Sequence, residues 1–131
     1  MAPRSLRRGV AATELAVCMP VIVLIVLASM EACAMLFLQQ SLSVAAYEGA
    51  RVALSPGAGS SDVTTQCQQI LKDREVNGAT VSISPADVPG AAEGTWITVR
   101  ATAPFARNSL AGGWLFGAKT LTADVQMMKE R

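Results

Sequence analysis

The sequence predicts an α+β fold, in which a long N-terminal transmembrane helix continues as an amphipathic helix and is packed by a small antiparallel sheet. Three observations predict it: an apolar run near the N-terminus, a helical pattern that continues beyond this run, and three short alternating stretches typical of strands. The chain has 131 residues, of which 51% are hydrophobic and 16% charged. We divide it into a basic leader (1–9), the long helix (10–54) and an extracytoplasmic α+β domain (55–131).

Residues 15–38 form the apolar run, and their one charged residue is Glu31. A bilayer core about 30 Å thick takes roughly 20 helical residues, so this run is long enough to span a membrane. The alternative is a core helix of a soluble protein, but a domain this small cannot cover a helix that is apolar all round. Glu31 has three available positions: at the outer headgroups, neutral within the membrane, or paired with a partner subunit. We favour the headgroups.

Charge is distributed unevenly along the chain. Residues 1–9 carry Arg4, Arg7 and Arg8 and no acid, whereas the remaining residues hold 8 of the 11 Lys and Arg together with all 10 Asp and Glu. A basic segment before an apolar run predicts a single-pass protein with its N-terminus in the cytoplasm and its C-terminal domain outside.

The helical pattern does not stop where the apolar run ends. An apolar stripe continues at helical spacing through Leu38, Leu42, Ala45, Ala46, Gly49 and Val52. We therefore predict one helix from about Ala11 to Leu54, ended by Ser55-Pro56-Gly57. Pro20 lies inside this helix, and membrane helices tolerate such a proline with a kink.

The outer domain is predicted to hold a second helix and three strands. Ser60-Ser61-Asp62 offers an N-cap for the helix, and Asn77-Gly78 is the expected end. The strands have apolar inner faces, made of Val81 and Ile83 in the first, Ile97, Val99, Ala101 and Ala103 in the second, and Leu121, Ala123, Val125 and Met127 in the third. The simplest assembly packs an antiparallel sheet on the exposed half of the first helix, with the second helix alongside.

A long connection precedes the third strand. Residues 108–117 of this connection hold Leu110, Trp114, Leu115 and Phe116 among glycines. Two interpretations remain open: a surface that meets a partner or the membrane, and a loop that closes over the core.

Several classes of function are excluded or disfavoured. The chain has no histidine, which excludes Ser-His-Asp, Cys-His and His-zinc chemistry. The net charge of +1 is too balanced for general nucleic-acid binding. Cys18 and Cys33 are about 22 Å apart on a helix, too far for a disulfide, and Cys67 is expected to be a buried small hydrophobe. We expect no enzyme activity, cofactor, metal site or small-molecule substrate.

The N-terminal residues Arg7-Arg8-Gly9-Val10-Ala11-Ala12-Thr13-Glu14-Leu15 resemble the processing site of type IVb prepilins. In that family a basic leader ends in Gly, a prepilin peptidase cuts after it on the cytoplasmic side, and the fifth mature residue is Glu. The resemblance implies a cut between Gly9 and Val10, and pairing of Glu14 with the N-terminal amine of a neighbouring subunit. A compatible role for Glu14 is to oppose the positive end of the helix dipole.

A second motif lies further along the helix. The run Gln40-Ser41-Leu42-Ser43-Val44-Ala45-Ala46-Tyr47-Glu48-Gly49-Ala50-Arg51 resembles the TadE-like group of pilin-like proteins from tight-adherence systems. Pro104-Phe105, Leu115-Phe116-Gly117 and Thr120-Leu121-Thr122-Ala123 are also similar to that group. The resemblance implies a pilin-like fold and a minor pilin or pseudopilin of a Flp-type pilus assembly and secretion system, serving adhesion or secretion. It implies residence in the inner membrane or the pilus, with prepilin peptidase, other pilin-like subunits and the assembly platform as partners.

A function of another class is a small secreted binding domain released by signal peptidase. Ala32-Cys33-Ala34 offers a small-x-small cleavage site after the apolar run. Two features disfavour it: Glu14 at the head of the run, and a helical pattern that continues past residue 34 without a turn.

Overall fold

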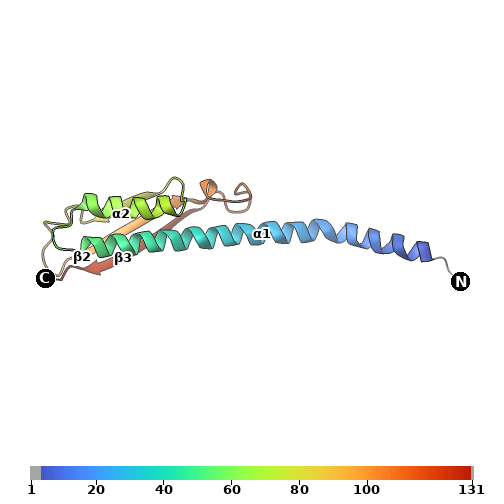
Figure 1. Ribbon diagram of the computed structural model, residues 1–131, viewed down its shortest axis with the longest axis horizontal. Coiled ribbons are helices and arrows are strands. Elements are labelled where there is room, and N and C mark those ends of the chain that lie inside the picture. Colours follow the sequence, from blue (N-terminus) through green and yellow to red (C-terminus); the bar gives the residue numbers. More distant parts are fainter. Residues whose placement is uncertain (1–3, 131) are drawn as a thin grey trace.

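The fold is seen in a computed structural model that describes residues 4–130, with side chains from Gly9 onward. It holds two helices, α1 (Arg4–Ala53) and α2 (Ser60–Asp73), three strands, β1 (Thr80–Ser84), β2 (Trp96–Pro104) and β3 (Thr120–Met128), and a short 3₁₀ turn, η1 (Phe105–Arg107). The strands form one antiparallel sheet in the order β1-β2-β3. The predicted α+β class, with a long apolar helix and a small antiparallel sheet, is confirmed (Figure 1).

Helix α1 begins earlier than expected. It starts at Arg4 rather than near Ala11, so Gly9 and Val10 lie within a continuous helix instead of at the end of an extended leader. It ends at Ala53, where the Ser55 amide donates to the Val52 carbonyl at 2.9 Å and Pro56 prevents a further helical turn. Pro20 stays inside the helix.

The two halves of α1 differ in burial. In the bare half, residues 9–30, no side chain is buried. In the packed half, residues 31–53, a stripe at helical spacing is buried. Figure 1 shows the same division: α2 and the sheet lie against one end of a long rod, and the other end extends alone. The head, defined here as residues 55–130, therefore packs on only part of the helix.

The core lies between the packed half of α1, α2 and the inner face of the sheet. The fully or almost fully buried apolar residues are Leu38, Leu42, Ala45, Ala46, Ala50 and Ala53 from α1, Val63, Cys67 and Leu71 from α2, Ile97, Val99, Ala101 and Ala103 from β2, and Val88 and Phe105 outside the strands. The central strand thus has the inner face that its alternation predicts. In the edge strand β3 only Ala123 of the four expected inner residues is buried, because an edge strand has a neighbour on one side alone.

The outer face of the sheet is polar and carries one close ion pair. Arg100 and Asp124 are paired across β2 and β3, and the guanidinium donates to both carboxylate oxygens at 2.9 and 2.8 Å. The hydrogen bond from Arg100 holds the pKa of the Asp124 carboxyl below its usual range. Both side chains are largely exposed, so the pair contributes little to stability.

The N-cap of helix α2 lies one residue before the expected Ser60-Ser61-Asp62, and the helix ends early. Gly59 is the N-cap, and its amide donates to Asp62 Oδ2 at 2.8 Å. The expectation that Asn77-Gly78 ends the helix is wrong: it ends at Asp73. Glu75 adopts a left-handed conformation with φ 56°, and the Val76 amide donates back to the Leu71 carbonyl at 2.8 Å. This turn closes the helix and brings Val76 against the core.

Candidate functional site

The residues of the expected cleavage site lie on the first turns of α1. A Cβ atom added at Gly9 would meet nothing within 4 Å, so packing within the described chain does not require glycine there. Val10 and Glu14 are exposed on the bare half, one helical turn apart. The side chains of Arg4, Arg7 and Arg8 lie outside the described residues, although their backbone belongs to α1.

The bare half has the properties of a membrane span. Among the residues that the structure describes, one helical segment, Gly9–Ala53, is long and apolar enough to cross a membrane. Its most apolar window has a mean hydropathy of 2.6, and 17% of that window is buried inside the protein. An apolar helix surface that the protein does not cover itself needs lipid or other helices around it.

Glu31 marks the boundary between the two halves. Its side chain is 0% exposed, so the protein itself covers it. Oε1 accepts hydrogen bonds from the Ser109 hydroxyl and, at 3.2 Å, from the Gly113 amide. Oε2 has no hydrogen-bond partner among the described residues. The 108–117 loop therefore supplies two donors to one oxygen of this buried side chain, and a buried polar group is costly without such partners.

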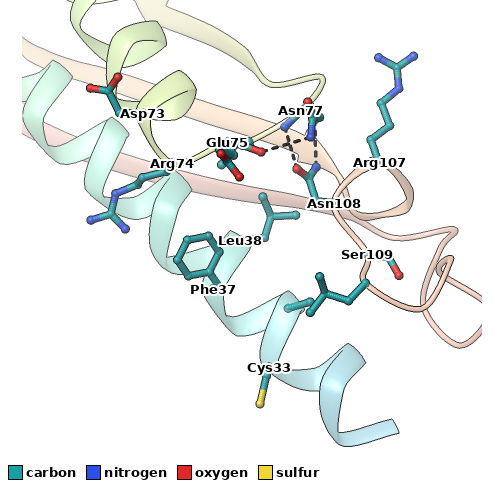
Figure 2. Close-up of a pocket in the computed structure, with 13 residues that line it drawn as sticks. Cys33, Phe37, Leu38, Asp73, Arg74, Glu75, Asn77, Arg107, Asn108 and Ser109 are labelled. Atoms are coloured by element: carbon teal, nitrogen blue, oxygen red, sulfur yellow. Dashed lines mark hydrogen bonds between the residues drawn. The ribbon is translucent and has the colours of Figure 1, made fainter. Parts of the chain in front are cut away.

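The start of the 108–117 loop is fixed to the turn that follows α2. The Asn77 amide donates to Asn108 Oδ1 at 2.7 Å, and Asn108 Nδ2 donates to the carbonyls of Asn77 and Pro104 at 3.0 and 2.9 Å. Figure 2 shows the two bonds between Asn77 and Asn108. Asn77, expected to end α2, therefore positions this loop instead.

A groove of about 870 Å³ lies between α1, the end of α2 and the start of the 108–117 loop. Cys33, Phe37 and Leu38 of α1 line one side, and Asp73 and Arg74 lie above them at the end of α2 (Figure 2). The Arg107 side chain, also at its rim, points away from Phe37 and Leu38. The groove has no convergent set of catalytic groups, and the described residues hold no cluster of His, Cys, Asp or Glu that could bind a metal ion.

The Glu48-Gly49-Ala50-Arg51 block of α1 is divided between the core and the surface. A Cβ atom at Gly49 would collide with Cys67 Sγ and lie 3.3 Å from Val99 Cγ1, so only glycine allows α2 and β2 to approach α1 this closely. Ala50 is fully buried. Glu48 and Arg51 lie outside and form an ion pair of 3.6 Å, in which the Arg51 side chain is 72% exposed.

The three cysteines are free thiols, as the sequence predicts for Cys18 and Cys33 on α1. Cys67 is fully buried and its thiol donates to the Ala45 carbonyl at 3.2 Å. Burial raises the pKa of the Cys67 thiol to about 11, although a hydrogen bond from the backbone of Cys67 itself acts in the opposite direction. The prediction of a buried small hydrophobe is therefore confirmed, and Cys67 is poorly reactive at neutral pH.

Comparison with known proteins gives a family match within the long helix α1. Residues 9–51 match the family model described as TadE-like protein. No curated protein and no solved structure matches the chain. The matched segment begins at Gly9 and ends at Arg51, so it covers the bare half and most of the packed half of α1, whereas α2 and the sheet lie outside it. The resemblance to the TadE-like family is thereby confirmed over residues 9–51.

Proposed function

We propose that the protein is a minor pilin or pseudopilin of the tight-adherence type IV pilus apparatus. It is made as a precursor in the inner membrane, and prepilin peptidase removes the leader between Gly9 and Val10. The mature chain then takes part in pilus biogenesis as a structural subunit rather than as an enzyme. The observation that carries this proposal is the uncovered apolar half of α1, which lies inside the segment that matches the TadE-like model.

The surroundings of Gly9 support cleavage at this residue. Packing within the described chain does not require glycine at position 9. Because nothing lies within 4 Å of a Cβ at this position, a side chain can be added there without disturbing the head. Glycine lowers helix stability by roughly 1 kcal/mol relative to alanine, which favours local opening of α1 at the bond that a peptidase must reach. The leader therefore needs to unwind only one or two turns at the cytoplasmic surface.

Glu14 supports assembly through its position. It is exposed on the bare half, and neither of the two ion pairs of the described chain includes it. A carboxylate at the edge of hydrocarbon is costly without an opposite charge. Cleavage creates an amine on Val10, and the same amine on a neighbouring subunit offers that charge. Packing of several bare halves side by side would bring the two groups together.

The test compares variants in cells that hold the apparatus. Gly9→Glu should leave the leader attached, so that intact-mass spectrometry gives the precursor, while Gly9→Ala introduces only a methyl group and should be processed. Glu14→Gln should be processed but should reduce the number of pili, because the charge is lost after the cut. Ser29→Ala is the matched control, since the Ser29 hydroxyl bonds only within its own helix, to the Ile25 carbonyl at 2.8 Å.

Two results would overturn the proposal. Processing of Gly9→Glu at the wild-type rate would contradict cleavage by prepilin peptidase after Gly9. A wild-type number of pili in Glu14→Gln would contradict pairing of Glu14 with the amine of a neighbouring subunit. A wild-type chain that begins at Met35 would instead favour release by signal peptidase. The packing of Ala34 and Leu38 against the head argues against that cut, because it would separate Glu31 from Ser109 and Gly113.

A further inference from the structure

We propose that the 108–117 loop enters the outer interface of the lipid bilayer, fastened to the spanning helix by Glu31. The loop would then hold the head against the membrane surface. This inference requires that α1 crosses a membrane, and it does not depend on cleavage or on a role in the pilus. Three observations carry it: the depth of the loop along α1, the side chains that it exposes, and its hydrogen bonds to Glu31.

The length of the bare half places the loop at the level of lipid. Residues 15–30 are apolar and uncovered, and at 1.5 Å per residue they span about 24 Å, which is less than the hydrocarbon thickness of about 30 Å. The outer part of the hydrocarbon layer therefore coincides with residues 31–34, where Glu31 and Ala34 are buried. Figure 1 shows the connection between β2 and β3 extending beyond the end of α2 toward the bare half.

The loop exposes side chains that suit this environment. Leu110 is 70% exposed, Trp114 56% and Leu115 41%. Tryptophan and leucine at the boundary of hydrocarbon and headgroups are stabilised there, whereas in water three such side chains on one loop would be unfavourable. The loop thus adds exposed apolar side chains to those of the bare half.

The charges around the loop fit a membrane surface. Residues 104–120 carry Arg107 and Lys119 and no carboxylate. Lys119 Nζ lies 5.2 Å from the centre of the Phe116 ring, and both basic side chains are exposed. Long basic side chains beside an apolar segment reach lipid phosphates while their stems stay in the interface. The expected occupant is therefore a bilayer with anionic headgroups.

Glu31 explains how an irregular loop can remain folded at this depth. Polar backbone groups at the level of the hydrocarbon need internal partners, and the Gly113 amide lies 2.6 Å from Ser109 Oγ and 3.2 Å from Glu31 Oε1. Gly112 and Gly113 have φ of 81° and 70°, and a Cβ at Gly113 would lie 3.0 Å from Gly117 Cα. The two glycines turn the loop back so that Ser109 and Gly113 both face the carboxylate.

The two tryptophans provide a matched test. Trp96 is 59% exposed, like Trp114, but it begins β2, whereas the loop follows the other end of that strand. Nine residues of strand separate the two ends by roughly 26 Å at about 3.3 Å per residue. Trp96→Phe leaves Trp114 as the single reporter, and Trp114→Phe leaves Trp96. The full chain is placed in vesicles of phosphatidylethanolamine and phosphatidylglycerol, with part of the lipid brominated in the upper acyl chain.

We expect brominated lipid to quench Trp114 fluorescence about twofold and to leave Trp96 fluorescence almost unchanged, because tryptophan at the interface meets the upper acyl chains. Equal and weak quenching of both, in protein that floats with the vesicles, would overturn loop insertion and assign Leu110 and Trp114 to a protein partner or to water. Failure of the protein to float with the vesicles would overturn the membrane span as well.

A second pair of variants tests the role of Glu31. Ser109→Ala removes one donor to its carboxylate and should reduce the quenching of Trp114 while the circular dichroism of the head stays unchanged. Ser43→Ala is the control, since its hydroxyl bonds only to the Gln39 carbonyl within α1, at 2.9 Å. Undiminished quenching in both variants would show that Glu31 and Ser109 do not fasten the loop.

Discussion

The two halves of α1 are continuous in sequence but differ in the size and burial of their apolar side chains. In the bare half large aliphatic side chains point in every direction and none is buried. In the packed half the buried stripe is dominated by small residues, namely Ala34, Ala45, Ala46, Gly49, Ala50 and Ala53, with Leu38 and Leu42 between them. Small side chains let α2 and the sheet approach the helix closely, whereas bulky ones fill the space around a helix in lipid. Side-chain size thus separates the two roles that one helix performs.

The largest expected difference between the halves concerns two leucines. Leu42→Ala, in the packed half, removes a fully buried side chain and should lower the free energy of unfolding of the head by about 2–5 kcal/mol. Leu24→Ala, in the bare half, changes a residue that is 51% exposed and should lower it by less than about 0.5 kcal/mol. Urea titration of the full chain in detergent micelles measures both. Similar losses in the free energy of unfolding would mean that both halves of α1 contribute equally to the stability of the head.

The two glycines sharpen the comparison. Gly49→Ala places a Cβ against Cys67 Sγ and should cost about 1–3 kcal/mol through overpacking, whereas Gly9→Ala, with open space around it, should cost nothing. The double variant Gly49→Ala with Cys67→Ala should recover part of the loss, since the colliding sulfur is removed. The same urea titration measures these stabilities. If the effects of the two substitutions simply add, the loss in Gly49→Ala does not come from a collision with Cys67 Sγ.

Alkaline pH should weaken the packing of α2 against the packed half through Cys67. Its pKa rises from 9.0 to about 11 on folding, so the folded state favours the protonated thiol. The resulting stability is fully present below pH 9 and is lost as the pH rises from 9 through 11. Unfolding measured at a series of pH values should show this loss in the wild type. Cys67→Ala should lack it, and an identical pH profile in that variant would assign the loss to other groups.

The smallest expected effect concerns the surface of the Glu48–Arg51 block. Arg51→Ala breaks an exposed ion pair of 3.6 Å and should change the stability of the head by less than about 0.5 kcal/mol. Pilus counts in cells provide the second measurement. A reduction in pili without a loss of stability would assign Glu48 and Arg51 to contacts between subunits, and a loss of more than 1 kcal/mol would place them in the fold of the head.

Much of the fold follows from local sequence patterns. The alternation of Ile97, Val99, Ala101 and Ala103 predicts the inner face of the central strand, because burial on one side of a sheet repeats every second residue. The spacing of Leu38, Leu42, Ala45, Ala46 and Gly49 likewise predicts the packed stripe of α1. The start of α1 differs, since nothing in residues 4–10 breaks a helix and single glycines are tolerated.

The features that sequence patterns miss are contacts between distant residues. Glu31 is covered by Ser109 and Gly113, which lie 78 and 82 positions further along the chain. No local sequence pattern could therefore distinguish a covered Glu31 from a carboxylate exposed at the headgroups. The early end of α2 depends on the left-handed Glu75, a residue type that rarely adopts this conformation. The one local signal was the pair of glycines at 112 and 113, which allowed a tight return of the loop.

The central claim is that the bare half stays attached to the head and lies in a membrane. N-terminal sequencing of the wild-type chain, recovered from the membrane fraction of cells that hold the apparatus, tests it most directly. The account predicts Val10 as the first residue, with the whole apolar run retained. A chain that begins at Met35 and is found in the soluble fraction would contradict it.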